Sequence, residues 1–189
     1  FPTRRSSDLL LSEIQHPFSL ILFDHHTDLA FNDDVPLISC GSWVSMALQT
    51  LPLLNRVVII GANTLNLFQA SGIPDKVTVI SEQEVRRLSP VDIVRAIRSV
   101  LPDGPVYISV DKDVLDPDNA VTNWDQGSMT LRQLLDVIRE LKRLRPIVGE
   151  DICGELPLSP VDVLCDERVP QLKKNEIANK AIVDILLAG

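Results

Sequence analysis

Short runs that are apolar on both faces alternate in this chain with longer stretches whose apolar residues have helical spacing. A strand is apolar on both faces where helices cover both sides of a parallel sheet. Strands that alternate with helices indicate βαβ units, because parallel strands need a crossover connection. The sequence therefore predicts an α/β fold: a three-layer α/β/α sandwich around a mostly parallel sheet.

The expected strands cover residues 18–24, 56–61, 77–80, 105–111 and 146–152. Helices are expected over residues 42–54, 81–84, 90–101, 130–144 and 174–187. Capping-box patterns open two of the helices, and a serine followed by proline opens a third. The proline-rich stretch 157–173 is expected to be a long loop.

Composition limits the class of protein. The chain has 189 residues, which fits one domain, and 45% of them are hydrophobic, enough for a sizeable core. The net charge of −8 argues against nucleic-acid and anionic-membrane partners. No apolar run is long enough to span a bilayer. Three cysteines without a disulfide pattern fit a reducing compartment, so we expect a cytoplasmic protein.

Residues 1–9 are treated separately from the domain at 10–189. Phe-Pro-Thr-Arg-Arg-Ser-Ser-Asp-Leu is one reading frame of a common short-read sequencing adapter, and no methionine begins the chain. We expect these residues to be read-through, and a disordered basic tail is the alternative. On this interpretation the chain is truncated at its N-terminus.

Acidic and imidazole side chains follow the first expected strand. Asp24, His26 and Asp28 come directly after the apolar residues 18–23. Side chains two residues apart in a strand point to the same face, so these three are expected to lie together. The pattern alone also fits a solvated loop, but such groups at a buried sheet edge are costly without a neutralising charge. His25 points to the other side and is expected to be packed or hydrogen-bonded.

A second acidic pair follows the strand expected at 105–111. Asp111 and Asp113 share a face, and Lys112 between them points away. Alone, this pair also fits a capping aspartate with a surface salt bridge. The carboxyl ends of parallel strands meet at one edge of the sheet, so both motifs are expected to converge there. Two divalent cations balance four aspartates, and carboxylates with one imidazole suit Mn²⁺, with Zn²⁺, Fe²⁺ or Co²⁺ as alternatives.

The two motifs, in this order, resemble those of the arginase/agmatinase (ureohydrolase) superfamily. The matching segments are Asp-His-His-Thr-Asp at 24–28, Ser-Val-Asp-Lys-Asp-Val-Leu-Asp-Pro at 109–117 and Gly-Glu-Asp-Ile-Cys-Gly-Glu at 149–155. The resemblance implies an arginase-like fold whose first strands are missing here, and a binuclear manganese centre. It also implies hydrolysis of C–N bonds in linear amidines or guanidino compounds. Members often form trimers or hexamers, so a homo-oligomer fits the resemblance.

Carried over residue by residue, the resemblance implies five metal ligands. Asp24 and Asp111 are the expected bridging carboxylates, Asp28 binds the first metal, and His26 and Asp113 bind the second. Asp28 is also expected to shuttle a proton. The family's remaining ligand is a histidine from an earlier strand end, and that segment is absent from this sequence.

Three departures from the family pattern concern the catalytic and substrate-binding residues. Cys40 stands in or near the place of a proton-shuttling histidine, as a catalytic thiol or a small buried residue. Trp124 and Asp125 lie in a loop that is usually rich in proline and glycine. They are expected to form a wall and a cation acceptor of the substrate pocket, or a purely structural loop. Glu155 lies four residues after Asp151, where the family's substrate-binding glutamate lies three after, and it is the second candidate acceptor.

These departures predict a divergent, arginase-like member of undefined substrate. One alternative function is a zinc-dependent amide hydrolase like the deacetylases that share this fold, whose sites have one histidine and two aspartates around a single ion. Another alternative is a non-catalytic metal-binding or regulatory protein. The replacement of the proton-shuttling histidine by Cys40 favours this alternative.

Overall fold

The computed structural model describes residues 5–30, 39–64, 73–157 and 168–188. Within these ranges a five-stranded sheet has the order β3-β2-β1-β4-β5, and every neighbouring pair is parallel. The strands are β1 Phe18–Phe23, β2 Leu54–Ala62, β3 Val77–Ser81, β4 Val106–Asp111 and β5 Ile147–Cys153. The sheet confirms the predicted α/β class, and its strands lie close to the predicted ranges.

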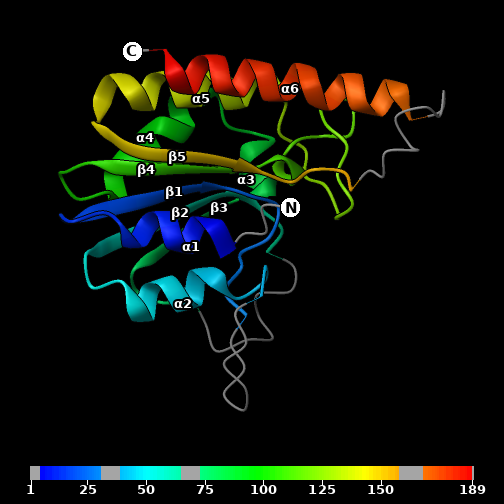
Figure 1. Ribbon diagram of the computed structural model, residues 1–189. Coiled ribbons are helices and arrows are strands. Elements are labelled where there is room, and N and C mark those ends of the chain that lie inside the picture. The colour runs from blue at the N-terminus through cyan, green and yellow to red at the C-terminus, as the bar shows by residue number, and fades with distance from the viewer. Residues whose placement is uncertain (1–4, 31–38, 65–72, 158–167, 189) are drawn as a thin grey trace.

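Helices cover both faces of this sheet (Figure 1). On one face lie α1 Arg5–Ser12 and α2 Trp43–Thr50. On the other lie α4 Pro90–Val100, α5 Leu131–Leu144 and α6 Val169–Leu187. Two short elements follow strands directly: α3 Glu82–Val85 comes after β3, and the 3-10 turn η2 Lys112–Val114 comes after β4. The three layers are those predicted.

The core forms two apolar clusters, one on each side of the sheet. Leu20 and Leu22 of β1 belong to the cluster that contains Trp43 of α2. Ile21 and Phe23 belong to the other cluster, which contains residues of α4, α5 and α6. All six residues of β1 are buried, because alternate side chains face opposite helical layers. Each such buried Leu or Ile side chain stabilises the fold by about 1.5–3 kcal/mol.

Side-chain caps fix where three helices begin. Ser81 and Glu84 form a capping box at α3, and Thr130 and Gln133 form another at α5. The Ser89 hydroxyl accepts the Asp92 amide at the start of α4, after which Pro90 occupies the first turn. Each pattern satisfies backbone N–H groups that have no partner inside the helix. These helix starts are as predicted.

Two helix boundaries and one whole helix differ from the prediction. Helix α2 ends at Thr50 and not at residue 54, because Leu51 precedes a proline and is extended there. Helix α6 begins at Val169, so the predicted loop is wrong for 169–173, and residues 158–167 lie outside the described ranges. Helix α1 was not predicted, since residues 1–9 were set aside, and the division at residue 10 stays a prediction.

The sheet brings the two acidic motifs to one edge. β1 and β4 are neighbours, with Phe23 in register with Val110, so Asp24 and Asp111 follow adjacent strand ends. Among the described residues, none of the helices has the length and apolar character needed to cross a membrane.

Candidate metal centre

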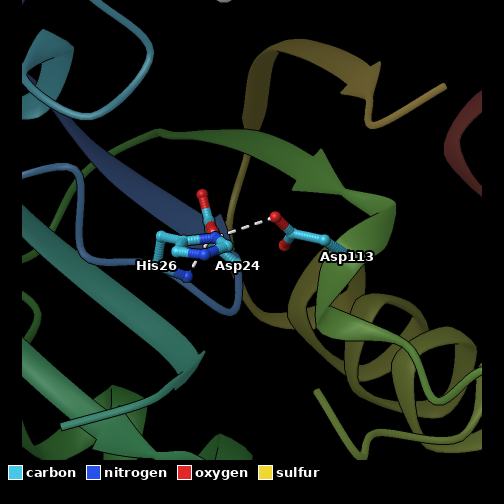
Figure 2. Close-up of side chains that lie close together, drawn as sticks. All are labelled: Asp24, His26 and Asp113. Atoms are coloured by element: carbon cyan, nitrogen blue, oxygen red, sulfur yellow. Dashed lines mark hydrogen bonds and ion pairs between the residues drawn. The ribbon is translucent and has the colours of Figure 1, made fainter. Parts of the chain in front are cut away.

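Three of the predicted ligands converge at the carboxyl edge of the sheet. Each of Asp24, His26 and Asp113 offers one ligand atom, and these atoms lie within 4.8 Å of one another (Figure 2). The two carboxylates are almost fully buried, with exposed fractions of 0% and 1%, whereas the His26 side chain is 38% exposed. We refer to these three residues as the ligand cluster.

The same local turn shapes both motifs. The Asp24 Oδ1 atom accepts the backbone N–H of His26 at 2.6 Å. The Asp111 Oδ1 atom likewise accepts the backbone N–H of Asp113 at 2.8 Å. An aspartate that bonds the amide two residues ahead bends the chain away from its strand. The patterns Asp-x-His and Asp-x-Asp therefore fold alike and present their second residue at the same edge.

Asp113 ties the two turns together. Its Oδ2 atom lies 2.9 Å from His26 Nδ1, and its Oδ1 atom accepts the backbone N–H of His25 at 3.0 Å. The His25 side chain is 5% exposed and lies outside the ligand cluster. Because both Asp113 oxygens bond to the first motif, the two strand ends form one site.

The electrostatics of the cluster favour a positive charge. Burial and the nearby Asp24 charge raise the pKa of Asp113 to about 7. Hydrogen bonds to Asp113 and Asp24 raise the pKa of His26 to about 10, against the effect of burial. Two buried carboxylates thus hold a proton on the imidazole between them. Two carboxylates and an imidazole are also a donor set that suits a divalent transition metal, so the residues fit one.

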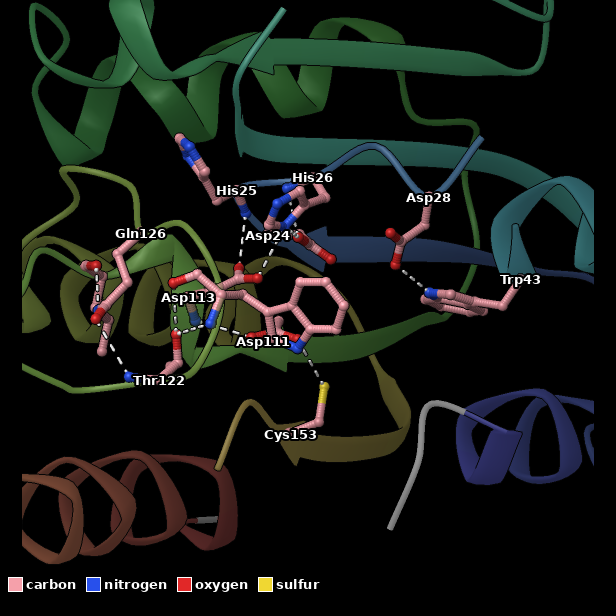
Figure 3. A network of polar contacts seen from close by, with 12 residues as sticks. Asp24, His25, His26, Asp28, Trp43, Asp111, Asp113, Thr122, Gln126 and Cys153 are labelled. Atoms are coloured by element: carbon pink, nitrogen blue, oxygen red, sulfur yellow. Dashed lines mark hydrogen bonds and ion pairs between the residues drawn. The ribbon is translucent and has the colours of Figure 1, made fainter. Parts of the chain in front are cut away.

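Asp28 lies beside the cluster with a different partner. Its Oδ2 atom accepts the indole N–H of Trp43 in α2 at 2.6 Å (Figure 3). Asp28 is buried and has φ of 51°, in the left-handed region that few non-glycine residues adopt. Asp28 is not one of the three residues whose ligand atoms form the cluster. Trp43 was not predicted as a site residue, and its position at the start of an apolar helix gave no signal of this contact.

Asp111 also lies outside the cluster of three. Besides the Asp113 amide, it has Cys153 as a neighbour, whose Sγ atom lies 3.5 Å from Asp111 Oδ2 (Figure 3). The backbone of Gly154 also lies close to Asp111. A Cβ atom at Gly154 would overlap Asp111 Oδ1 and would lie 2.7 Å from the backbone nitrogen of Lys112.

Glu155 has a cation of the protein itself as its partner. The Lys112 side chain is fully buried and forms an ion pair with Glu155, while its Nζ atom also donates to Asn179 Oδ1 at 2.7 Å. Burial lowers the pKa of Lys112, and Glu155 opposes this shift. The role of Glu155 as an acceptor for a cationic substrate stays a prediction. A substrate that bound Glu155 would have to displace the Lys112 ammonium group.

The remaining predicted residues are exposed. Trp124 is 53% exposed, and its ring lies edge-on to His26 with 6.1 Å between ring centroids. Asp125 follows it on the surface. Cys40 is exposed in the turn before α2, and no described contact joins its thiol to the ligand cluster. The structure thus brings Trp124 to the cluster, and the catalytic role of Cys40 stays a prediction.

A sequence model of the arginase family matches residues 7–160, most of the chain. The chain belongs to the arginase family. Its parallel sheet and the ligand cluster at the strand ends agree with this membership.

Similar proteins give the same family and fold. An uncharacterized protein of Thermotoga maritima is 33% identical over 148 residues, which cover 77% of this chain and 51% of the relative. An agmatinase of Bacillus subtilis is 28% identical over 147 residues, covering 74% of this chain and 47% of the relative. The chain thus spans about half the length of these curated relatives. The fold is similar to the crystal structure of a hypothetical agmatinase from Burkholderia thailandensis, with a TM-score of 0.73 and 21% sequence identity. The match covers 98% of this chain and 57% of the agmatinase chain.

Proposed function

We propose that the protein containing this chain is a metal-dependent hydrolase of C–N bonds in guanidino compounds. The observation that carries the proposal is the ligand cluster of Asp24, His26 and Asp113 at the strand ends of an arginase-family sheet. The agmatinase of Bacillus subtilis, which is similar over three quarters of the chain, supports a guanidino substrate.

We further propose a centre of two Mn²⁺ ions. The ligand cluster would help to hold one ion, and Asp28 and Asp111 would contribute ligands to the pair. Four aspartates with one imidazole balance two divalent charges, and this mixture of oxygen and nitrogen ligands suits Mn²⁺. When bound, such ions supply Lewis-acid chemistry and a water that is nucleophilic near neutral pH.

The protein's own residues orient the substrate and move a proton. The Trp43 indole holds the Asp28 carboxylate in one direction, which suits a proton acceptor beside the cluster. Trp124, exposed next to His26, supplies a flat wall for a planar cation. Asp125 is the preferred acceptor of the substrate's charge, because Glu155 already pairs with Lys112.

A metal count combined with a substrate panel tests this function. The intact protein that contains this chain is loaded with Mn²⁺, its metal content is measured, and urea release is followed from agmatine, arginine and other guanidino compounds. We expect close to two Mn²⁺ per subunit of that intact protein and turnover of at least one guanidino compound. The D24N variant serves as control and should lose both. A folded wild type that binds no metal would rule the function out.

A zinc-dependent amide hydrolase is the second candidate. The observation that favours it is that the cluster contains one histidine and two aspartates, which is a single-ion donor set. It predicts one Zn²⁺ per subunit and activity on acetylated amines with none on guanidino compounds. Metal binding without turnover on either panel would instead favour a non-catalytic metal-binding protein.

A further inference from the structure

Helix α6 contacts the segment 112–125, which begins just after β4, through polar side chains. Asn175 is 5% exposed and bonds both backbone groups of Val121: its Nδ2 donates to the carbonyl at 2.8 Å, and its Oδ1 accepts the amide at 2.8 Å. Lys174 Nζ donates to the carbonyl of Pro117 at 2.6 Å. A single helix thus contacts this segment at two points.

The third contact of α6 is with Lys112, in the turn that contains the predicted ligand Asp113. Lys112 lies between Asp111 and Asp113, and its buried ammonium group contacts both Asn179 of α6 and Glu155. Asn179 Nδ2 also donates to Glu155 Oε1 at 2.8 Å, so the three side chains form a closed network. A buried ammonium is costly unless it is paired, so this network determines where the backbone of residue 112 lies.

These polar contacts are separate from the packing of α6. Ala178, Ile182 and Leu186 already bury an apolar stripe of the helix in the core. Packing alone would hold the helix on the sheet and requires none of the three polar residues. Each of them has a partner between residues 112 and 121, in the segment that has Asp113 near one end and Trp124 near the other.

We propose that α6 is a positioning element for the metal centre, acting through Asn175, Asn179 and the Lys112–Glu155 pair. It sets the conformation of segment 112–125, and through it the place of the Asp113 carboxylate and of Trp124. The proposal rests on the metal binding proposed above. Asn175, Asn179 and Lys112 are positioning residues, because each acts through the backbone or side chain of another residue.

Metal affinity separates positioning from general stability. The K112M variant keeps an apolar stem of similar length and leaves Glu155, whose side chain is 44% exposed, in contact with water. The variant N179A removes the contact from the helix side, and N175L removes both bonds to Val121. Mn²⁺ affinity of the full chain is measured by calorimetry, together with thermal melts and hydrogen exchange of residues 112–125 in the metal-free protein.

We expect K112M and N179A to weaken Mn²⁺ binding by about 10–100-fold, the usual effect of removing groups that orient ligands. N175L should also speed hydrogen exchange in residues 112–125. The matched control I182V shortens a core side chain of the same helix and should lower the melting temperature without changing Mn²⁺ affinity. The second control, K180M, removes the exposed pair with Asp184 and should change neither.

Different outcomes would overturn the two proposals separately. Wild-type Mn²⁺ affinity in K112M, N179A and N175L would overturn the positioning role and leave the metal centre intact. Loss of affinity in I182V in proportion to its lower melting temperature would also overturn it, because stability alone would then explain the effect. A wild type that binds no Mn²⁺ would overturn the metal centre, and the positioning role with it.

Discussion

At the residue scale, two short patterns build most of the ligand cluster. Asp24 and Asp111 each accept the amide two residues ahead, so each strand ends in the same turn and presents His26 or Asp113 at the edge. This geometry depends only on neighbours in sequence. Other residue-scale features depend on distant partners, and two of them give predictions.

The contact between Trp43 and Asp28 is one such feature. The variant W43F removes a hydrogen bond to a buried carboxylate, so we expect a loss of about 1.5–3 kcal/mol in the free energy of unfolding, with a further loss from packing. Urea denaturation of W43F, D28A and the double variant isolates the coupling between the two side chains. The exposed Trp124 gives the matched control, since W124F should unfold like the wild type. Additive effects of W43F and D28A would contradict a stabilising contribution from this hydrogen bond.

The close approach of Gly154 to Asp111 is the second feature that depends on a distant partner. Its φ is +81°, and a Cβ atom there would overlap Asp111 Oδ1. We expect G154A to cost about 2–4 kcal/mol, from the left-handed backbone and the overlap together, and to weaken metal binding. Chemical denaturation and Mn²⁺ titration measure the two effects. G41A is the control, because a Cβ atom at Gly41 meets nothing within 4 Å. If both alanine variants behaved alike, the close approach would have no energetic consequence.

At the element scale, caps and apolar spacing account for the helices. The residues that open α3, α4 and α5 act within three or four positions of one another, which is why sequence patterns located these starts. The end of α2 before the Leu51–Pro52 pair and the start of α6, which has no side-chain cap, are the boundaries that the sequence patterns predict less accurately.

The capping box of α5 gives a prediction at this scale. Thr130 Oγ1 accepts the Gln133 amide at 3.1 Å, so T130A should lower the free energy of unfolding by about 1 kcal/mol. T130S keeps the hydroxyl and should remain close to the wild type. Urea midpoints of the three proteins measure the difference. Equal losses in the serine and alanine variants would show that the methyl group of Thr130, and not its hydroxyl, stabilises the helix.

At the scale of the whole molecule, the order of the strands makes the site. β1 and β4 are far apart in sequence but adjacent in the sheet, and their ends bring Asp24 and Asp113 together. A cation at this point relieves the repulsion between buried carboxylates, so metal binding and folding stability are coupled.

Metal removal tests this coupling. A ligand at 100 times its dissociation constant stabilises the folded state by about 2.7 kcal/mol, which for a chain of this size raises the melting temperature by about 5–11 °C. We therefore expect saturating Mn²⁺ to raise the melting temperature by that amount and a chelator to reverse it. Calorimetry of wild type and D24N measures the shift. A similar rise in D24N would place the ion elsewhere.

The sequence by itself determined the parallel α/β sheet, the starts of α3, α4 and α5, and the convergence of Asp24, His26 and Asp113. These follow from apolar periodicity, local caps and the rule that parallel strands end at one edge. Only the tertiary structure decided that Asp28 bonds Trp43 and that Lys112 is buried against Glu155 and Asn179. Lys112 and Asn179 are 67 residues apart, and no local pattern selects a partner at that distance, because packing of α6 on the sheet brings them together.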